Sequence, residues 1–464
     1  MTRLQLQSII DQLLLLRPEI ILIAGAVALL LLVPFRNNEW LLKSLVTTVI
    51  IVAFLLAKPF EGLFFEKMLI FDSIAFSIKR LLMLVTVLIV WFDTKAHHHL
   101  EYYFFLLAGL VGAMLMTTTS HFLLIYLAIE LASFASYFLT GLRFQIKSGE
   151  ATIKYVLFGG VTSSIMLFGI SLIYGAQGSL LLLDLSNQPL SNVGLVLFAG
   201  GMLFKAGLVP FHLWTPNVYQ EAPSDAVAFF SVVPKLGAFV LIYHVMSFLP
   251  ISLYSVGQDI GIVIALITVL WGTLSAIPQD KVKRMMAYGA IAHSGFLLPM
   301  TLFGEVGLTA FSYYSVIYAI MNVGIFYILH LHESDELSTL KFTDLDGFGT
   351  KYPWVAAGAV VLLIGLVGLP PTAGFTAKLF LFSLIADQYQ TGSDPLLMAF
   401  LVVGILSSLL SLYYYFKIPI SYFFRTSENA HVQLSSAQQF AATILAMILL
   451  WVFIQPEILN RFVF

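Results

Sequence analysis

Apolar segments of about 20 residues recur along this chain almost without gaps from Glu19 onward. Inside a bilayer no water is available to the backbone, so a segment of this kind crosses as a helix that satisfies its own N–H and C=O groups. We count about fourteen such segments, near residues 19–35, 41–57, 72–92, 101–118, 121–141, 153–176, 190–210, 225–248, 259–277, 285–303, 307–331, 354–388, 395–418 and 438–456. The predicted fold class is an all-α polytopic membrane protein with about 14 transmembrane helices.

The composition agrees with this class and excludes several functions. Hydrophobic residues make up 59% of the chain and charged residues 10%, whereas soluble domains carry about 25% charged residues. The net charge of −2 offers no basic patch for nucleic acid. The absence of cysteine excludes disulfides, cysteine-ligated iron–sulfur clusters and thiolate nucleophiles. Any redox chemistry is therefore expected on another chain.

The positions of Lys and Arg predict the orientation, because these residues favour short cytoplasmic loops. They follow predicted spans five, nine, eleven and thirteen, as Arg143, Lys147, Lys154, Lys281, Lys283, Arg284, Lys341, Lys351, Lys417 and Arg425. The loops after spans four, six, eight, ten and twelve contain neither residue, while Lys58 and Lys67 after span two are exceptions. With an even number of spans, this alternation places both termini outside, on the side opposite the cytoplasm.

Prolines interrupt two of the predicted spans. Pro210 lies in GLVPFHLWTP, and Pro370 and Pro371 lie in GLVGLPPTAGF. Proline removes a helical hydrogen bond, and irregular backbone at membrane depth must be buried in protein or line water. An ordinary proline kink explains either one alone, but breaks at corresponding positions of two halves are typical of inverted-repeat transporters. Spans four to eight and nine to thirteen are therefore predicted to form two inverted five-helix repeats, with helices seven and twelve broken.

Among the charged residues within predicted spans, four stand out: Glu130, Lys205, Lys235 and Lys378. A charge near the bilayer centre costs about 2.5–3.5 kcal/mol and usually faces a cavity or a partner. A structural ion pair or a side chain reaching the interface is the alternative, but Lys235 lies too deep in its span for its stem to reach either surface. A lysine whose carboxylate partner approaches or withdraws can bind and release a proton. We therefore predict a proton path through these four residues.

Histidines extend this path, because imidazole accepts and donates protons near neutral pH. His212 follows Lys205 at a distance of about 10.5 Å if the helix continues past Pro210, and His293 lies in the middle of the tenth span. Packing of a buried histidine is the alternative for each.

The other charged and histidine positions are expected to be structural. The histidine tract 97–99 is predicted to be a solvated loop and not a metal site. Lys79 and Arg80 are expected to reach the interface or to pair with Asp72, which lies on the same helix face. Haem ligation by facing histidines is not favoured, since the candidates show no repeated pairing; they are His121, His212, His244 and His293. No cofactor or metal is expected on this chain.

Several motifs together resemble one known family. The most specific stretch is FKAGLVPFHLWTPNVYQEAPSDAVAFFSVVPKLGAF over 204–239. It is accompanied by IELASF around Glu130, SGEATIKYVLFGG from Ser148, DKVKRMMAYGAIAHSGFLL from Asp280 and GLPPTAGFTAKLFLF from Gly368. From about residue 100 to about residue 420, the chain resembles the subunit N family of bacterial respiratory complex I, the NADH-quinone oxidoreductase.

The resemblance implies a role for each matched position in a proton relay. It makes Glu130 the glutamate that modulates the channel lysine Lys205, Lys235 the connecting lysine, and Lys378 the lysine on the exit side. The remaining relay members that it implies are His212, His293 and Lys154. One loop departs from the family pattern: YQEAPSDAVAF carries Glu221 and Asp225 where the family has YxGAPT followed by an apolar residue.

The predicted spans and the two breaks also give a domain plan. It is a three-helix segment over 1–100, a first inverted repeat over 101–248, a second over 259–418, each repeat forming a proton half-channel, and a C-terminal loop and last helix over 419–464.

The function that the resemblance implies is proton translocation in the membrane arm of this complex. NADH, FMN, iron–sulfur clusters and quinone would belong to partner subunits, and the neighbours would be other antiporter-like membrane subunits in the lipid bilayer. An Mrp-type cation/proton antiporter subunit is the main alternative, and whether sodium replaces the proton is left open. A stand-alone solute transporter with its site at the broken helices is a second alternative. A membrane enzyme is least favoured, because no nucleophile or metal motif is present.

Overall fold

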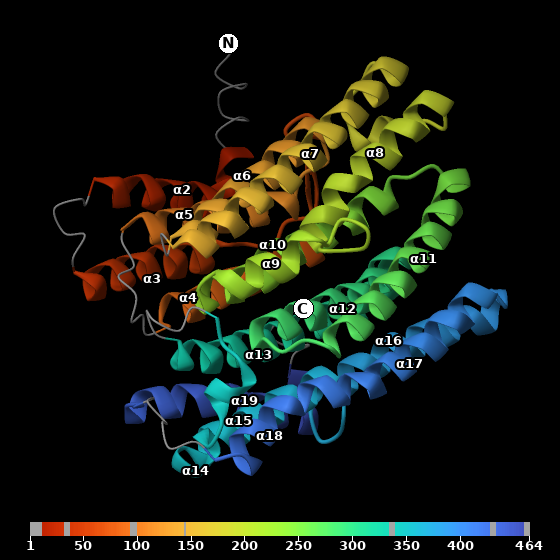
Figure 1. The fold of residues 1–464 in the computed structure, drawn as a ribbon. Helices are drawn as coiled ribbons and strands as arrows, with labels where there is room; N and C mark the ends of the chain where they lie inside the picture. Colours follow the sequence, from red (N-terminus) through yellow and green to blue (C-terminus); the bar gives the residue numbers. More distant parts are fainter. Residues whose placement is uncertain are drawn as a thin grey trace. The chain divides into compact units, whose positions relative to one another are not determined.

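A computed structural model describes residues 12–31, 38–92, 100–142, 145–333, 339–426 and 433–458. Nearly all of these residues are helical (Figure 1). The histidine tract 97–99 and Arg143 lie outside the described residues.

The described residues form two compact units. Of these residues, the first unit contains those within 1–142, 156–206 and 233–254, and the second contains those within 143–155, 207–232 and 255–464. The elements of the first unit are η1 (Leu14–Leu16), α2 (Arg17–Leu30), α3 (Glu39–Leu56), β1 (Gly62–Phe64), β2 (Leu69–Phe71), α4 (Ser73–Val90), α5 (Leu100–Met116), α6 (Phe122–Gly141), η3 (Leu182–Asp184) and α8 (Pro189–Ala206). Residues of α7 (Ile146–Gln177), α10 (Ser224–Ser247) and α11 (Ile251–Ala276) are divided between the units.

The second unit contains most of α11 and the elements that follow it. It also contains α9 (Trp214–Glu221), which precedes α11. The elements that follow α11 are α12 (Val282–Leu302), α13 (Gly304–His332), η4 (Phe342–Leu345), α14 (Phe348–Lys351), α15 (Pro353–Val367), α16 (Ala373–Gly392), α17 (Pro395–Tyr415), α18 (Lys417–Phe424) and α19 (Ser436–Ile454).

The predicted all-α membrane fold is confirmed. Each predicted span contains a helix, and ten helices among the described residues are long and apolar enough to cross a bilayer. The count of fourteen stays a prediction, because four of the predicted spans contain none of these ten helices. Among the helices in those four spans, α2, α5 and α15 have only 14, 17 and 15 residues. At about 1.5 Å per residue, 15 residues reach about 22 Å of a hydrocarbon core about 30 Å thick.

The first predicted helix break is present in the chain, between α8 and α9. Helix α8 ends at Ala206, and Pro210, four residues later, has no N–H with which to continue the helical hydrogen bonds. Gly207 follows with φ +70°, the left-handed conformation in which glycine commonly ends helices. Helix then resumes at Trp214.

The second break, between α15 and α16, repeats this arrangement. Helix α15 ends at Val367, whose carbonyl would need an N–H from Pro371. Gly368 has φ +84°, and α16 begins at Ala373. The prediction that two spans are broken at these prolines is therefore confirmed.

Other contacts of the first unit also recur in the second. Helices α5 and α6 run side by side (Figure 1) and meet at Gly112, where an added Cβ would lie 2.6 Å from the Ala132 nitrogen. Helices α11 and α12 meet in the same way at Gly272, with 2.6 Å to the Ala292 nitrogen. Glycine is required at both positions because any side chain would strike the neighbouring backbone.

The connections between helices follow the predicted alternation within each unit. In the first unit the loops after predicted spans two, four and six bond to one another, through Ser120 N to Met68 O at 2.9 Å and Leu182 N to Ser120 O at 2.9 Å. In the second unit the loops after spans nine, eleven and thirteen, which carry Lys and Arg, do the same. Their bonds are Val282 N to Leu340 O at 3.0 Å, Gly347 N to Ser421 O at 3.1 Å and Lys417 Nζ to Gln279 O at 3.2 Å. Alternate loops therefore share one end of their unit, as predicted.

Candidate functional site

In the first unit, Glu130 on α6 and Lys205 on α8 lie around two serine hydroxyls. The Lys205 ammonium is 2% exposed and donates to Ser133 Oγ at 3.2 Å. Ser133 lies one turn after Glu130 on the same face of α6, and Ser163 of α7 donates a short hydrogen bond to Glu130 Oε1. Four polar side chains from three helices therefore meet within an apolar bundle.

The electrostatics of this cluster suit a lysine that changes its protonation state. The Glu130 carboxylate attracts the Lys205 ammonium, while the hydrogen bond that Lys205 makes is to the neutral Ser133 hydroxyl. Charges interact strongly in a low dielectric, so a small movement of the carboxylate changes the balance between ammonium and amine. The sequence did not single out Ser133 and Ser163; the spacing of three residues between Glu130 and Ser133 was the available signal for the first.

Lys235 lies on α10 directly after Pro234, which removes a hydrogen bond inside the helix. It is 2% exposed, and nearly all of the residues around it on α10 are buried. Its side chain is therefore enclosed by protein, as predicted from its depth in the span.

In the second unit, Lys378 of α16 donates to a backbone carbonyl that the second helix break leaves without its helical N–H partner. Its Nζ donates to the Val367 carbonyl at 2.7 Å and to Ser408 Oγ at 3.1 Å. This carbonyl is the one that Pro371 cannot satisfy. The ammonium also lies 4.7 Å from the centre of the Phe296 ring, a distance at which a cation is attracted to an aromatic face.

His293 belongs to the same part of the second unit. It lies one turn before Phe296 on α12, and the two ring centres are 6.1 Å apart. Its Nδ1 is hydrogen-bonded to Tyr314 Oη at 2.8 Å. His293, Phe296 and Lys378 therefore form one cluster.

His212 and Lys154 lie elsewhere. His212 lies in the segment between α8 and α9, is 4% exposed and packs edge-on against Trp271. The predicted distance from Lys205 to His212 is wrong in its premise, because the helix ends at Ala206 and does not continue past Pro210. Lys154 is half exposed and pairs with Glu150 at 2.5 Å, which is a surface contact.

The predicted pairing of Lys79 with Asp72 is also wrong. Lys79 makes a buried ion pair with Glu19 of α2, and Asp72 bonds His244 Nε2 of α10 at 2.9 Å. Both partners come from helices distant in sequence, which a local pattern does not reveal.

The loop that departs from the family pattern is buried next to an ion pair in the second unit. Lys283 Nζ lies 2.7 Å from Glu333 Oε1, and Ser224 Oγ donates to the same oxygen at 2.7 Å. Lys283 also donates to the Ala222 carbonyl at 2.7 Å. Glu333 therefore fixes the connection from α9 to α10, which carries Glu221 and Asp225. Among the described residues, no group of three or more His, Cys, Asp or Glu is arranged to hold a metal ion.

Membrane helices broken at prolines and carrying buried lysines define a transporter-like polytopic membrane protein. Residues 119–411 match the family described as NADH:quinone oxidoreductase/Mrp antiporter, TM, and the chain belongs to this family. The resemblance predicted from its motifs is confirmed.

Two relatives illustrate the match. The chain is 32% identical over 415 residues to NADH-quinone oxidoreductase subunit N 1 of Thermodesulfovibrio yellowstonii. This match covers 86% of this chain and 88% of the relative. It is 35% identical over 331 residues to NADH-quinone oxidoreductase subunit N 2 of Chloroherpeton thalassium, covering 66% of this chain and 62% of the relative. The matches span 62% to 65% of the lengths of that relative and three others.

Solved structures share the fold over almost the whole chain. A chain of respiratory complex I from Thermus thermophilus matches with a TM-score of 0.83 and 28% identity, covering 96% of this chain and 98% of that one. A chain of the Mrp complex from Dietzia sp. matches with a TM-score of 0.84, covering 98% of this chain and 96% of that one; at 20% identity it shows the fold alone.

Proposed function

We propose that this chain translocates protons across a bacterial inner membrane as the antiporter-like subunit N of an NADH-quinone oxidoreductase. The observation that carries the proposal is the Lys205 site. The buried Lys205 ammonium donates to the neutral Ser133 hydroxyl, and the Glu130 carboxylate, on the same face of α6 as Ser133, attracts the ammonium. Such a lysine gains and loses a proton as the carboxylate moves. Membership of the family and the relatives named subunit N support the assignment.

The relay that we propose begins with Glu130 and Lys205. A movement of Glu130 away from Lys205 destabilises the ammonium, which gives up its proton to water and becomes a neutral amine. Lys235 and then Lys378 receive the proton, with His293 and His212 as intermediate carriers and Lys154 in a minor role. The two repeats, 101–248 and 259–418, would act as the two half-channels.

Lys378 is suited to the last step. Its amine can remain hydrogen-bonded to the Val367 carbonyl in either protonation state, because an ammonium and a neutral amine both have N–H donors. The nitrogen therefore stays in place while its proton leaves.

The energy for transport would come from partner subunits. The chain has no cysteine, so iron–sulfur clusters with cysteine ligands would be held elsewhere, together with FMN and the sites for NADH and quinone. Neighbouring antiporter-like subunits would contact this chain in the bilayer. Both termini would lie on the periplasmic side.

Replacement of Lys235 tests the proposal in the assembled complex. We expect Lys235→Ala to lower NADH-driven proton uptake by membrane vesicles at least several-fold, because about 1.4 kcal/mol of added barrier already slows a step ten-fold. Lys147→Ala removes an exposed lysine and is the control. Unchanged proton uptake by the Lys235 variant, in a complex that assembles and oxidises NADH, contradicts the relay.

The composition of the native complex separates the proposal from the Mrp-type alternative. Copurification with flavin and iron–sulfur subunits supports the oxidoreductase. A purely membrane complex that exchanges sodium for protons supports the antiporter.

A further inference from the structure

A second set of titratable side chains lies in the first unit, apart from the residues of the proposed relay. Glu19, Lys79 and His244 are buried, Asp72 is partly buried and Lys58 is exposed. Glu19 and His244 are 2% and 0% exposed, whereas the Asp72 side chain is 27% exposed. These residues therefore join the interior of the unit to its surface.

Asp72 makes the connection, because its two carboxylate oxygens bond different partners. Oδ1 accepts the Ala75 N–H at 2.8 Å and caps α4. Oδ2 lies 2.9 Å from Nε2 of His244. Burial acts to raise the pKa of the Asp72 carboxyl, but the hydrogen bond and charge of His244, the Ala75 N–H and the charge of Lys79 together hold this pKa below its ordinary value. Asp72 is thus a carboxylate that releases a bound proton readily.

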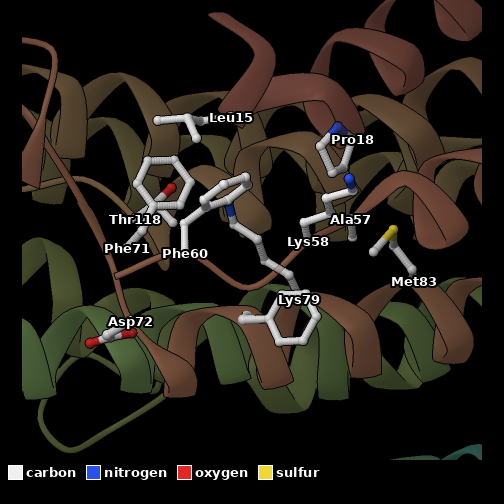
Figure 2. Close-up of a pocket in the computed structure, with 11 residues that line it drawn as sticks. Leu15, Pro18, Ala57, Lys58, Phe60, Phe71, Asp72, Lys79, Met83 and Thr118 are labelled. Atoms are coloured by element: carbon white, nitrogen blue, oxygen red, sulfur yellow. The ribbon is translucent and has the colours of Figure 1, made fainter. Parts of the chain in front are cut away.

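A small cavity opens beside Asp72. Figure 2 shows Asp72, Lys58, Lys79 and Thr118 among the side chains that line it, together with apolar residues. Water centres can occupy about 20 Å³ of it, which exceeds the roughly 10–15 Å³ that one water molecule needs. The wall is mostly apolar, but Asp72, Lys58, Lys79 and Thr118 are polar members of it, and a water needs about two to four polar partners.

His244 has a second nitrogen directed elsewhere. Its Nδ1 is buried and has no hydrogen-bond partner in the described part of the chain. An imidazole can accept a proton on one nitrogen while it gives one up from the other. Lys235 lies on the same helix, about 13.5 Å along the axis at about 1.5 Å per residue, a distance that a short chain of waters spans.

We propose that Asp72 and His244 form a proton port that connects the interior of the first unit, near Lys235, to the end of the unit formed by the loops after predicted spans two, four and six. His244 Nδ1 takes a proton from an interior water while the Nε2 proton passes to Asp72. Asp72 then releases it to water in the cavity. One proton enters and one leaves, and the ring exchanges tautomer before the next transfer.

The port rests on the proposed function and deepens it, since it adds a route for protons outside the relay residues. A packing role for the same pair is the competing explanation, and the choice of substitutions separates the two. Asparagine caps a helix about as well as aspartate, whereas glutamate does not, but glutamate keeps a titratable carboxyl. A structural role therefore predicts that Asp72→Asn is tolerated better than Asp72→Glu, and the port predicts the reverse order.

The experiment measures protons taken up per NADH oxidised in vesicles containing the assembled complex. We expect Asp72→Asn and His244→Gln to lower this ratio at least two-fold, and Asp72→Glu to recover most of it. The controls are Asp394→Asn, which changes the aspartate that caps α17, and His121→Gln, which changes another histidine of the first unit. Both controls should keep the normal ratio.

Each outcome has a definite consequence. If Lys235→Ala lowers the ratio while Asp72→Asn and His244→Gln behave like the controls, the port is refuted and the relay stands. A normal ratio in the Lys235 variant as well refutes the proposed function itself. If His244→Gln prevents assembly, the two Asp72 variants decide. A lower ratio of protons to NADH in Asp72→Glu than in Asp72→Asn overturns the port.

Discussion

Substitution of Gly368 displaces Lys378 by an amount that the structure fixes. A Cβ added at Gly368 would lie 2.5 Å from Lys378 Cδ. Ordinary contact begins at 3.4 Å, so the lysine stem must move by about 0.9 Å. Applied to Nζ, this shift lengthens the 2.7 Å bond to the Val367 carbonyl to about 3.6 Å, which is no longer a hydrogen bond. The atom that yields belongs to a flexible side chain, so the backbone of the break stays in place.

Gly368→Ala should therefore lower NADH-driven proton uptake by about ten-fold, since a misplacement of about 1 Å in a reacting group can cost up to about 100-fold. Electron transfer from NADH to quinone, followed as NADH oxidation in leaky vesicles, serves to show that the complex has assembled. Proton uptake in sealed vesicles is the measurement of interest.

Gly178 provides the matched control. It also has a positive φ, +68°, but an added Cβ there meets no atom within 4 Å. An alanine at either position costs about 1–2 kcal/mol, because its backbone is left-handed. Only Gly368→Ala also displaces Lys378. If Gly178→Ala and Gly368→Ala pump equally well, the position of Lys378 against the Val367 carbonyl does not matter for transport.

Two further predictions concern the polar contacts of the buried lysines. Ser133→Ala removes the hydroxyl bonded to Lys205, a hydrogen bond worth about 1 kcal/mol, and should slow proton uptake about five-fold. The control Ser136→Ala removes only a bond to the Ala132 carbonyl of the same helix and should leave uptake unchanged. Equal rates of uptake in the two variants would contradict the role of Ser133. Glu333→Gln leaves Lys283 buried without its carboxylate and should destabilise the chain by about 3–5 kcal/mol, measured as a lower midpoint of thermal unfolding in detergent. The double variant Lys283→Met with Glu333→Leu should recover most of this loss. An unchanged midpoint in Glu333→Gln would contradict a stabilising ion pair.

Features that depend on local chemistry were predictable from the sequence. Pro210 and Pro371 end their helices because each lacks the N–H that the carbonyl four residues earlier requires. The burial of Lys235 followed from its depth in an apolar span, and its 2% exposure agrees.

Features that depend on which helices meet were not predictable. Asp72 and Lys79 share a helix face, so the sequence favours their pairing, yet each prefers a partner from another helix. Glu19 lies 60 residues from Lys79, and His244 lies 172 residues from Asp72. Neighbours brought together by the fold replace a contact two turns apart on one helix, because buried charges must be satisfied at short range.

The two helix breaks give their lysines different chemical surroundings. Lys205 comes just before the first break, donates to the Ser133 hydroxyl and is attracted by the Glu130 carboxylate of the same neighbouring helix. Lys378 comes after the second break and is held by a carbonyl of the interrupted helix itself. The charge on Lys205 therefore responds to movement of a side chain, whereas Lys378 is fixed by the backbone. A relay built on these two residues would be switched at the first break and would keep a constant geometry at the second.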